Sequence, residues 1–147
     1  MIKSPKPAFE KIEPGFGSSF SYRTYDENHE NNSHNFWHYH PELELVYVKG
    51  GTGKRQVGSH ISYYRNGELI LIGSNLPHCG FTDSLNNYER ETVIQMRPDF
   101  LGESFFNVPE MRSIKALFER AKMGIVFHGE LKRIIGSKIE TLKSLSN

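Results

Sequence analysis

As far as residue 96, the chain consists of short segments in which apolar and polar residues alternate, separated by turns rich in glycine and asparagine. The clearest segment is 42–48, where apolar side chains would occupy both faces of an extended strand around Glu44. A strand of this kind is expected to be buried on both sides. Further strands are predicted at 19–25, at 55–64 as two short strands, and at 68–72, 78–82 and 88–96. Seven or eight strands so closely spaced predict a sandwich or barrel.

Beyond Pro98 the spacing of apolar residues changes to that of helices. One helix is predicted at 108–122 and a second at 130–145, with a break between them at 123–129. The second helix carries a continuous apolar stripe, formed by Leu131, Ile134, Ile135, Ile139, Leu142 and Leu145. The expected fold is therefore mainly β, a barrel followed by two C-terminal helices.

The apolar stripe of the last helix has no evident place on a barrel that its own strands already close. We therefore expect a homodimer in which Leu131, Ile135, Leu142 and Leu145 form the contact. The alternative is that this helix packs back on the sheet. The stripe is still running at the last residues, so we also expect further protein beyond Asn147.

Composition limits the other possibilities. Residues 1–17, rich in Lys, Pro and Gly, are expected to form an N-terminal arm, followed by a barrel at 18–104 and a helical segment at 105–147. The formal net charge of +1 gives no general attraction for nucleic acid or an anionic membrane. A single cysteine excludes an internal disulfide framework. With no signal peptide and no apolar run that could span a bilayer, we expect a soluble cytoplasmic protein.

A group of histidine and glutamate residues carries the chemistry. His38, His40 and Glu44 have the same parity, so on extended chain they would project from one face, and His78 could join them from a neighbouring strand. Such nitrogen and oxygen donors suit Zn, Fe, Ni or Mn. A carboxylate between two leucines also needs a cation or hydrogen-bond donors if it is buried. His40 alone could supply these, so an organic ligand pocket without metal stays open as the alternative.

Other polar residues give weaker signals. Gln95 shares parity with Val93 and is expected to face the barrel interior, where it would contact a ligand or be a satisfied core group. Arg23 and Arg97 are available to a pocket, but their spacing does not mark out either of them. His29 and His60 lie in polar settings and are expected at the surface.

Two motifs resemble those of the cupin superfamily. They are His38-x-His40-x3-Glu44-x6-Gly51 and Gly67-x5-Gly73-x-Asn75-x2-His78. The resemblance implies an antiparallel double-stranded β-helix, or jelly-roll barrel. It also implies a metal held inside by His38, His40, Glu44 and His78.

A narrower resemblance covers almost the whole chain. Segments 40–45, 67–78, 99–102, 108–111 and 124–129 are similar to the N-terminal sensor domain of AraC-type transcription regulators. The resemblance implies a barrel that senses a small molecule, such as a sugar, and helices that dimerise it. DNA would be bound only by a separate C-terminal helix-turn-helix domain, which this sequence does not contain. The alternative function is a small metal-dependent cupin enzyme, a dioxygenase or isomerase, which would have no need of the long terminal helix.

Overall fold

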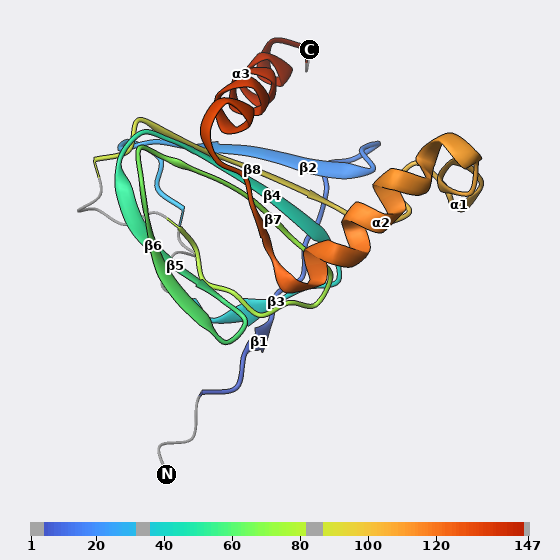
Figure 1. The fold of residues 1–147 in the computed structure, drawn as a ribbon, viewed down its shortest axis with the longest axis horizontal. Helices are drawn as coiled ribbons and strands as arrows, with labels where there is room; N and C mark the ends of the chain where they lie inside the picture. Colours follow the sequence, from blue (N-terminus) through green and yellow to red (C-terminus); the bar gives the residue numbers. More distant parts are fainter. Residues whose placement is uncertain (1–4, 32–35, 82–86, 146–147) are drawn as a thin grey trace.

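The computed structural model describes residues 5–31, 36–81 and 87–145. The predicted order of a barrel followed by helices is confirmed (Figure 1). The strands are β1 (Ala8–Phe9), β2 (Phe20–Tyr25), β3 (His38–Tyr39), β4 (Leu43–Lys49), β5 (Thr52–Val57), β6 (His60–Arg65), β7 (Glu68–Ile72), β8 (Arg90–Met96) and β9 (Ile125–Val126). The helices are α1 (Glu103–Phe106), α2 (Arg112–Arg120) and α3 (Gly129–Leu145), with short 3-10 turns η1 (Pro109–Met111) and η2 (Ala121–Met123).

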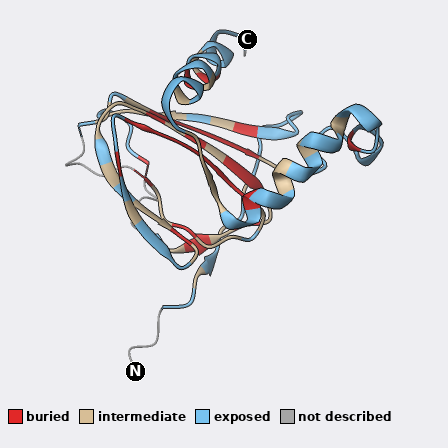
Figure 2. Cartoon of the chain, viewed as in Figure 1, coloured by how far each residue is buried: buried red, intermediate tan, exposed pale blue. Residues whose placement is uncertain are grey.

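The strands form two facing layers. One is an antiparallel sheet in the order β2-β8-β4-β7-β9, and opposite it lie the β5–β6 hairpin and the β1–β3 pair (Figure 1). The core between the layers comes from alternate residues of the sheet, with side chains of the hairpin and of the following connection packed against them. It comprises Val46, Val48, Val57, Tyr64, Ile70, Ile72, Phe81 and Val93. Figure 2 shows this burial along the central strands, so the predicted two-sided burial of the segment after Glu42 is confirmed.

Helix α3 covers the outer face of the sheet (Figure 1). Its buried Ile139 packs with Leu69 and Ile94, and the hydroxyl of Tyr22 donates to the Ile139 carbonyl at 3.0 Å. At Gly136 an added Cβ would lie 2.3 Å from the ring of Tyr47, so only glycine permits this close approach. The helix therefore packs back on its own barrel.

Several elements differ from the sequence-based expectation. The helix expected at 108–122 is divided into η1, α2 and η2, and α1 was not predicted. The expected break at 123–129 contains β9, which directly follows Gly124 at positive φ and pairs with β7. One strand of the sheet therefore comes from beyond residue 104, where the barrel was expected to end.

The N-terminal part of the chain also differs. The arm contributes β1, although no strand was expected there. The strand expected at 78–82 is reduced to isolated bridges from His78 to His38 and Val57. Residue 82, like residues 1–4 of the arm and the last two residues of the helical segment, lies outside the described part of the chain.

A buried ion pair joins the two layers at the β5–β7 side. Arg55 Nε lies 2.5 Å from Glu68 Oε2, and Arg55 Nη1 donates to Ser62 Oγ at 2.8 Å. The side chain of Glu68 is 2% exposed, so its charge depends on this partner.

Within the described residues, the helices are too short or too polar to cross a membrane.

Candidate metal and effector site

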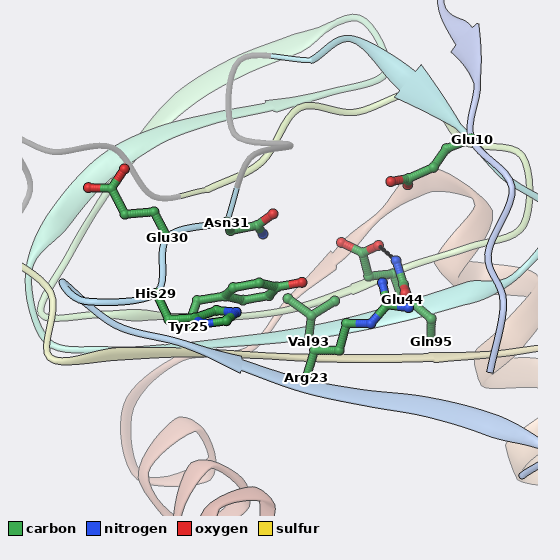
Figure 3. A pocket seen from close by; sticks show the side chains of 9 residues that line it. All are labelled: Glu10, Arg23, Tyr25, His29, Glu30, Asn31, Glu44, Val93 and Gln95. Atoms are coloured by element: carbon green, nitrogen blue, oxygen red, sulfur yellow. Dashed lines mark hydrogen bonds between the residues drawn. The ribbon is translucent and has the colours of Figure 1, made fainter. Parts of the chain in front are cut away.

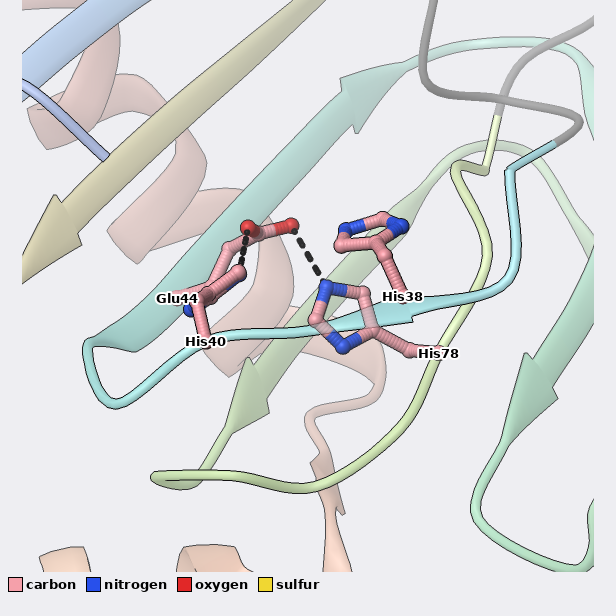
Figure 4. A group of neighbouring side chains, drawn as sticks. All are labelled: His38, His40, Glu44 and His78. Carbon is pink, nitrogen blue, oxygen red and sulfur yellow. Dashed lines mark hydrogen bonds and ion pairs between the residues drawn. The ribbon is translucent and has the colours of Figure 1, made fainter. Parts of the chain in front are cut away.

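Four side chains from three segments of the chain converge inside the barrel (Figure 4). His38 lies on β3, His40 follows it, Glu44 lies on β4, and His78 lies in the connection after β7. One potential ligand atom from each residue lies within 4.8 Å of the others, and all four residues are buried. Reciprocal backbone hydrogen bonds of 3.0 and 2.9 Å between His38 and His78 hold two of these segments together. The structure thus brings together the four residues that the sequence pattern selected.

Backbone carbonyl groups orient all three histidine rings. The Nδ1 atoms of His38, His40 and His78 lie 2.6, 3.1 and 2.8 Å from carbonyl oxygens two residues away in the chain. Because a carbonyl oxygen can only accept a hydrogen bond, Nδ1 carries the proton in each ring. In a neutral ring Nε2 then keeps its lone pair. In His40, whose Nε2 faces the Glu44 carboxylate, both nitrogens donate, and a bound metal would take the place of the Nε2 proton. Metal-ligating histidines are commonly oriented by a hydrogen bond of this kind.

The carboxylate of Glu44 is the centre of this group. Its Oε2 accepts hydrogen bonds from His40 Nε2 at 3.0 Å and from Gln95 Nε2 at 2.8 Å, and its Oε1 lies 3.5 Å from His78 Nε2. Burial would raise the pKa of Glu44, but the charge of His78 and the hydrogen bond from His40 outweigh burial and hold the pKa well below its usual range. The group is therefore an ionised carboxylate inside the barrel.

The histidines differ in their protonation. Burial and the neighbouring His78 lower the pKa of His38 to about 4, so His38 is neutral at pH 7. Burial would also lower the pKa of His40, but its hydrogen bond to Glu44 and the charge of that carboxylate raise it. The buried Nε2 of His78 has no hydrogen-bond partner among the described residues. This atom instead faces the Glu44 carboxylate at the ion-pair distance of 3.5 Å, and a bound cation would interact favourably with both groups.

These residues fit a divalent transition metal. Three imidazole nitrogens and one carboxylate form a donor set of the kind that binds Zn, Fe, Ni or Mn. The orienting carbonyl groups and Gln95 provide the supporting hydrogen bonds that such ligands usually have.

A polar cavity of about 250 Å³ adjoins this group (Figure 3). All the residues that line it are polar or charged except one valine; they are Glu10, Arg23, Tyr25, His29, Glu30, Asn31, Glu44, Val93 and Gln95. Glu44 thus belongs both to the four-residue group and to the cavity wall. Burial and the nearby charge of Glu44 raise the pKa of Glu10, which reaches the cavity from the arm.

Gln95 lies in the cavity wall, on the interior face expected for it, and donates to Glu44. The sequence did not mark out Arg23, Tyr25 or Glu10. The alternation of β2 could have identified the first two, since the strand pairs with β8 so that Arg23 lies opposite Val93. His29, expected at the surface, is exposed but lines the cavity rim.

The residues expected at a dimer contact divide into two groups. Ile135 is half-buried against the barrel, in the cluster that contains Ile139. Leu131, Leu142 and Leu145 are 49%, 41% and 76% exposed. The stripe is therefore wider than the face that the sheet covers, and part of it remains on the surface.

A jelly-roll barrel with three histidines and a glutamate converging in its interior defines the cupin class. The sequence model of the family described as AraC-like ligand binding domain matches residues 20–147, and the chain belongs to that family. It is a family of cupin-fold sensor domains of AraC regulators. A search of curated proteins gives no match for this chain.

Proposed function

We propose that this domain senses a small uncharged polyhydroxy molecule, such as a sugar, at a metal centre inside the barrel. The position of Glu44 supports this most directly, because the same carboxylate belongs to the candidate metal ligands and to the wall of the cavity. An effector in the cavity would lie beside the ion. Its binding would change the surroundings of the strands that support α3 on their outer face.

The size and charge of the cavity favour this class of effector. A volume of about 250 Å³ is below the ~300–1,000 Å³ of pockets for drug-sized ligands, so the occupant is small. Three carboxyl groups line the cavity against one guanidinium, that of Arg23, which disfavours an anion. The phenol, imidazole and amide groups in the wall can donate to and accept from hydroxyl groups.

In this proposal His38, His40, Glu44 and His78 hold the ion. A bound divalent metal supplies a Lewis-acidic position for the oxygen atoms of the effector. The chain's own groups orient the ligands, since the backbone carbonyls fix the rings and Gln95 fixes the carboxylate. We propose a regulatory role and no catalysis, because the family is one of regulatory sensors.

Replacing Arg23 by alanine is expected to weaken effector binding about tenfold or more. A hydrogen bond to a charged group contributes about 1.5–3 kcal/mol, which corresponds to this change in affinity. The measurement is calorimetric titration of metal-loaded protein with a panel of pentoses, hexoses and sugar alcohols.

Arg97→Ala is the matched control, because Arg97 is exposed and pairs with Asp99 outside the cavity. We expect it to leave effector affinity unchanged. Equal affinity of wild type and the Arg23 variant for every sugar that binds would place the effector outside this cavity.

We propose that the exposed part of the α3 stripe forms a homodimer. Replacing Leu131 and Leu142 together by glutamate is expected to give monomers in analytical ultracentrifugation, because each charge would have to be buried in the contact. Lys138→Glu, an equally large charge change at an exposed position of the same helix, should leave the dimer intact. A dimer that persists in the leucine variant would move the contact elsewhere on the domain.

The wider role follows from the family. We propose that DNA is bound by a helix-turn-helix domain of the same regulator and not by this domain, whose formal net charge is only +1. We further propose that the protein acts in the cytoplasm, where a regulator of this family meets its DNA.

A further inference from the structure

The N-terminal arm is attached to β3, the strand that carries His38 and is followed directly by His40. β1 pairs in parallel with β3, with Ala8 opposite His38. The backbone of Glu10 continues this pairing and donates to the Tyr39 carbonyl at 2.9 Å. The Phe9 and Tyr39 rings meet edge to face, with centroids 5.7 Å apart. These contacts hold Glu10 beside the four-residue group.

The side chain of Glu10 points into the barrel, toward Glu44 (Figure 3). Its Oε2 lies 3.3 Å from Nε2 of His38, and its side chain is 29% exposed. Nδ1 of His38 is occupied as the donor to the Phe36 carbonyl, so Nε2 is the ring nitrogen that faces Glu10. The Glu10 carboxylate therefore lies beside a candidate ligand atom of the four-residue group and lines the same cavity as Glu44. Carboxylate oxygen and imidazole nitrogen are both donors that divalent transition metals bind.

We propose that Glu10 is a further ligand of the metal centre, so that metal binding and docking of the N-terminal arm stabilise each other. This inference rests on the metal centre proposed above. The four-residue group provides donors from β3 and the residue after it, from β4, and from the connection after β7. Glu10 adds a carboxylate from a segment more than twenty-five residues earlier in the chain. If the domain binds the ion more tightly with the arm docked than with it undocked, thermodynamic linkage requires that the bound ion also stabilise the docked arm.

The docked arm has a consequence for the cavity. Glu10 lines the cavity as well as contacting His38, so metal, arm and effector share one compartment.

The test compares the full 147-residue chain with its Glu10→Gln and Glu13→Gln variants after removal of metal with a chelator. Glu13 is the matched control, since it lies on the same arm but is exposed and pairs with Lys11 at 2.7 Å. Titration with Co²⁺ and Zn²⁺ should show affinity about tenfold or more lower for the Glu10 variant, in line with the effect of losing a supporting group. The Glu13 variant should match wild type.

Two further readouts separate ligation from a merely structural role. The visible absorption bands of bound Co²⁺ should shift in the Glu10 variant alone, because they report the donors around the ion. Metal should slow hydrogen exchange in residues 5–14 of wild type and leave exchange in the Glu10 variant unchanged. The thermal midpoints of the metal-free proteins should agree, since Glu10 belongs to no core cluster of the described residues.

Each failure has a distinct meaning. Equal affinity, equal cobalt spectra and equal arm exchange in wild type and the Glu10 variant would reduce the contact to a simple His38–Glu10 ion pair and overturn the inference, while leaving the four-residue centre intact. Absence of metal binding in every protein, wild type included, would overturn the proposed centre and this inference with it.

Discussion

Replacing His38 and His40 together by alanine is expected to reduce bound metal from about one ion per chain to background. The two side chains supply two of the four donors that lie within 4.8 Å of one another. Loss of even a supporting group typically lowers metal affinity 10–100-fold, and loss of two ligands should exceed that. The measurement is elemental analysis by mass spectrometry of protein loaded with Zn²⁺ and passed through a desalting column.

His60→Ala is the matched control for this prediction. His60 is exposed on β6 and lies outside the four-residue group, so the variant should retain as much metal as wild type. Metal content that is the same in wild type and in the double variant would show that the ion, if bound, is held elsewhere.

Replacing Arg55 by methionine is expected to lower the free energy of unfolding by about 3–5 kcal/mol, the usual cost of removing one partner of a buried ion pair. The side chains of Arg55 and Glu68 are 14% and 2% exposed, so the variant would leave the charge of Glu68 buried without its partner. Methionine keeps much of the length of the side chain and removes its charge. Urea unfolding, monitored by circular dichroism, measures the change.

Arg65→Met supplies the comparison, because Arg65 is exposed at the end of β6. Its effect should stay within about 0.5 kcal/mol, as for most surface substitutions. Equal stability of the two variants would mean that the Arg55–Glu68 pair contributes little beyond its hydrophobic surroundings.

The parts of the structure that could be predicted depend on local periodicity. Alternation along β4 was sufficient to place Glu44 inside and Leu45 outside, because side chains on a strand project to opposite faces in turn. The same rule, with the second motif, selected the three histidines of the candidate metal group. Gln95 followed from its parity with Val93.

Features that depend on distant contacts were not predictable. β1 and β9 are two residues long, too short for a recognisable pattern, and each exists because a strand far away in the sequence offers its edge. The role of Glu10 at the site depends on the first of these pairings. The position of Glu10 could not be inferred from the sequence of residues 1–17, which predicts an arm with no apolar core of its own.

The docking of α3 illustrates the same limit. Part of the apolar stripe, Ile135 and Ile139, packs on the barrel, and this packing depends on groups elsewhere in the chain. Tyr22 donates to the helix backbone, and Tyr47 fits against Gly136. Arg90 and Lys49 lie 3.4 and 3.9 Å from the carboxylate of Glu140. None of these contacts has a signature in the helix sequence alone.

The central claim is that a metal ion and a small polyhydroxy effector share the interior of this barrel. The most direct test is calorimetric titration of the sugar panel into the same protein in two states, loaded with Zn²⁺ and stripped with a chelator. We expect at least one sugar to bind the loaded protein about tenfold or more tightly than the stripped protein, because the ion contributes to effector binding directly. Equal affinity in the two states, or no binding by any member of the panel, would contradict it.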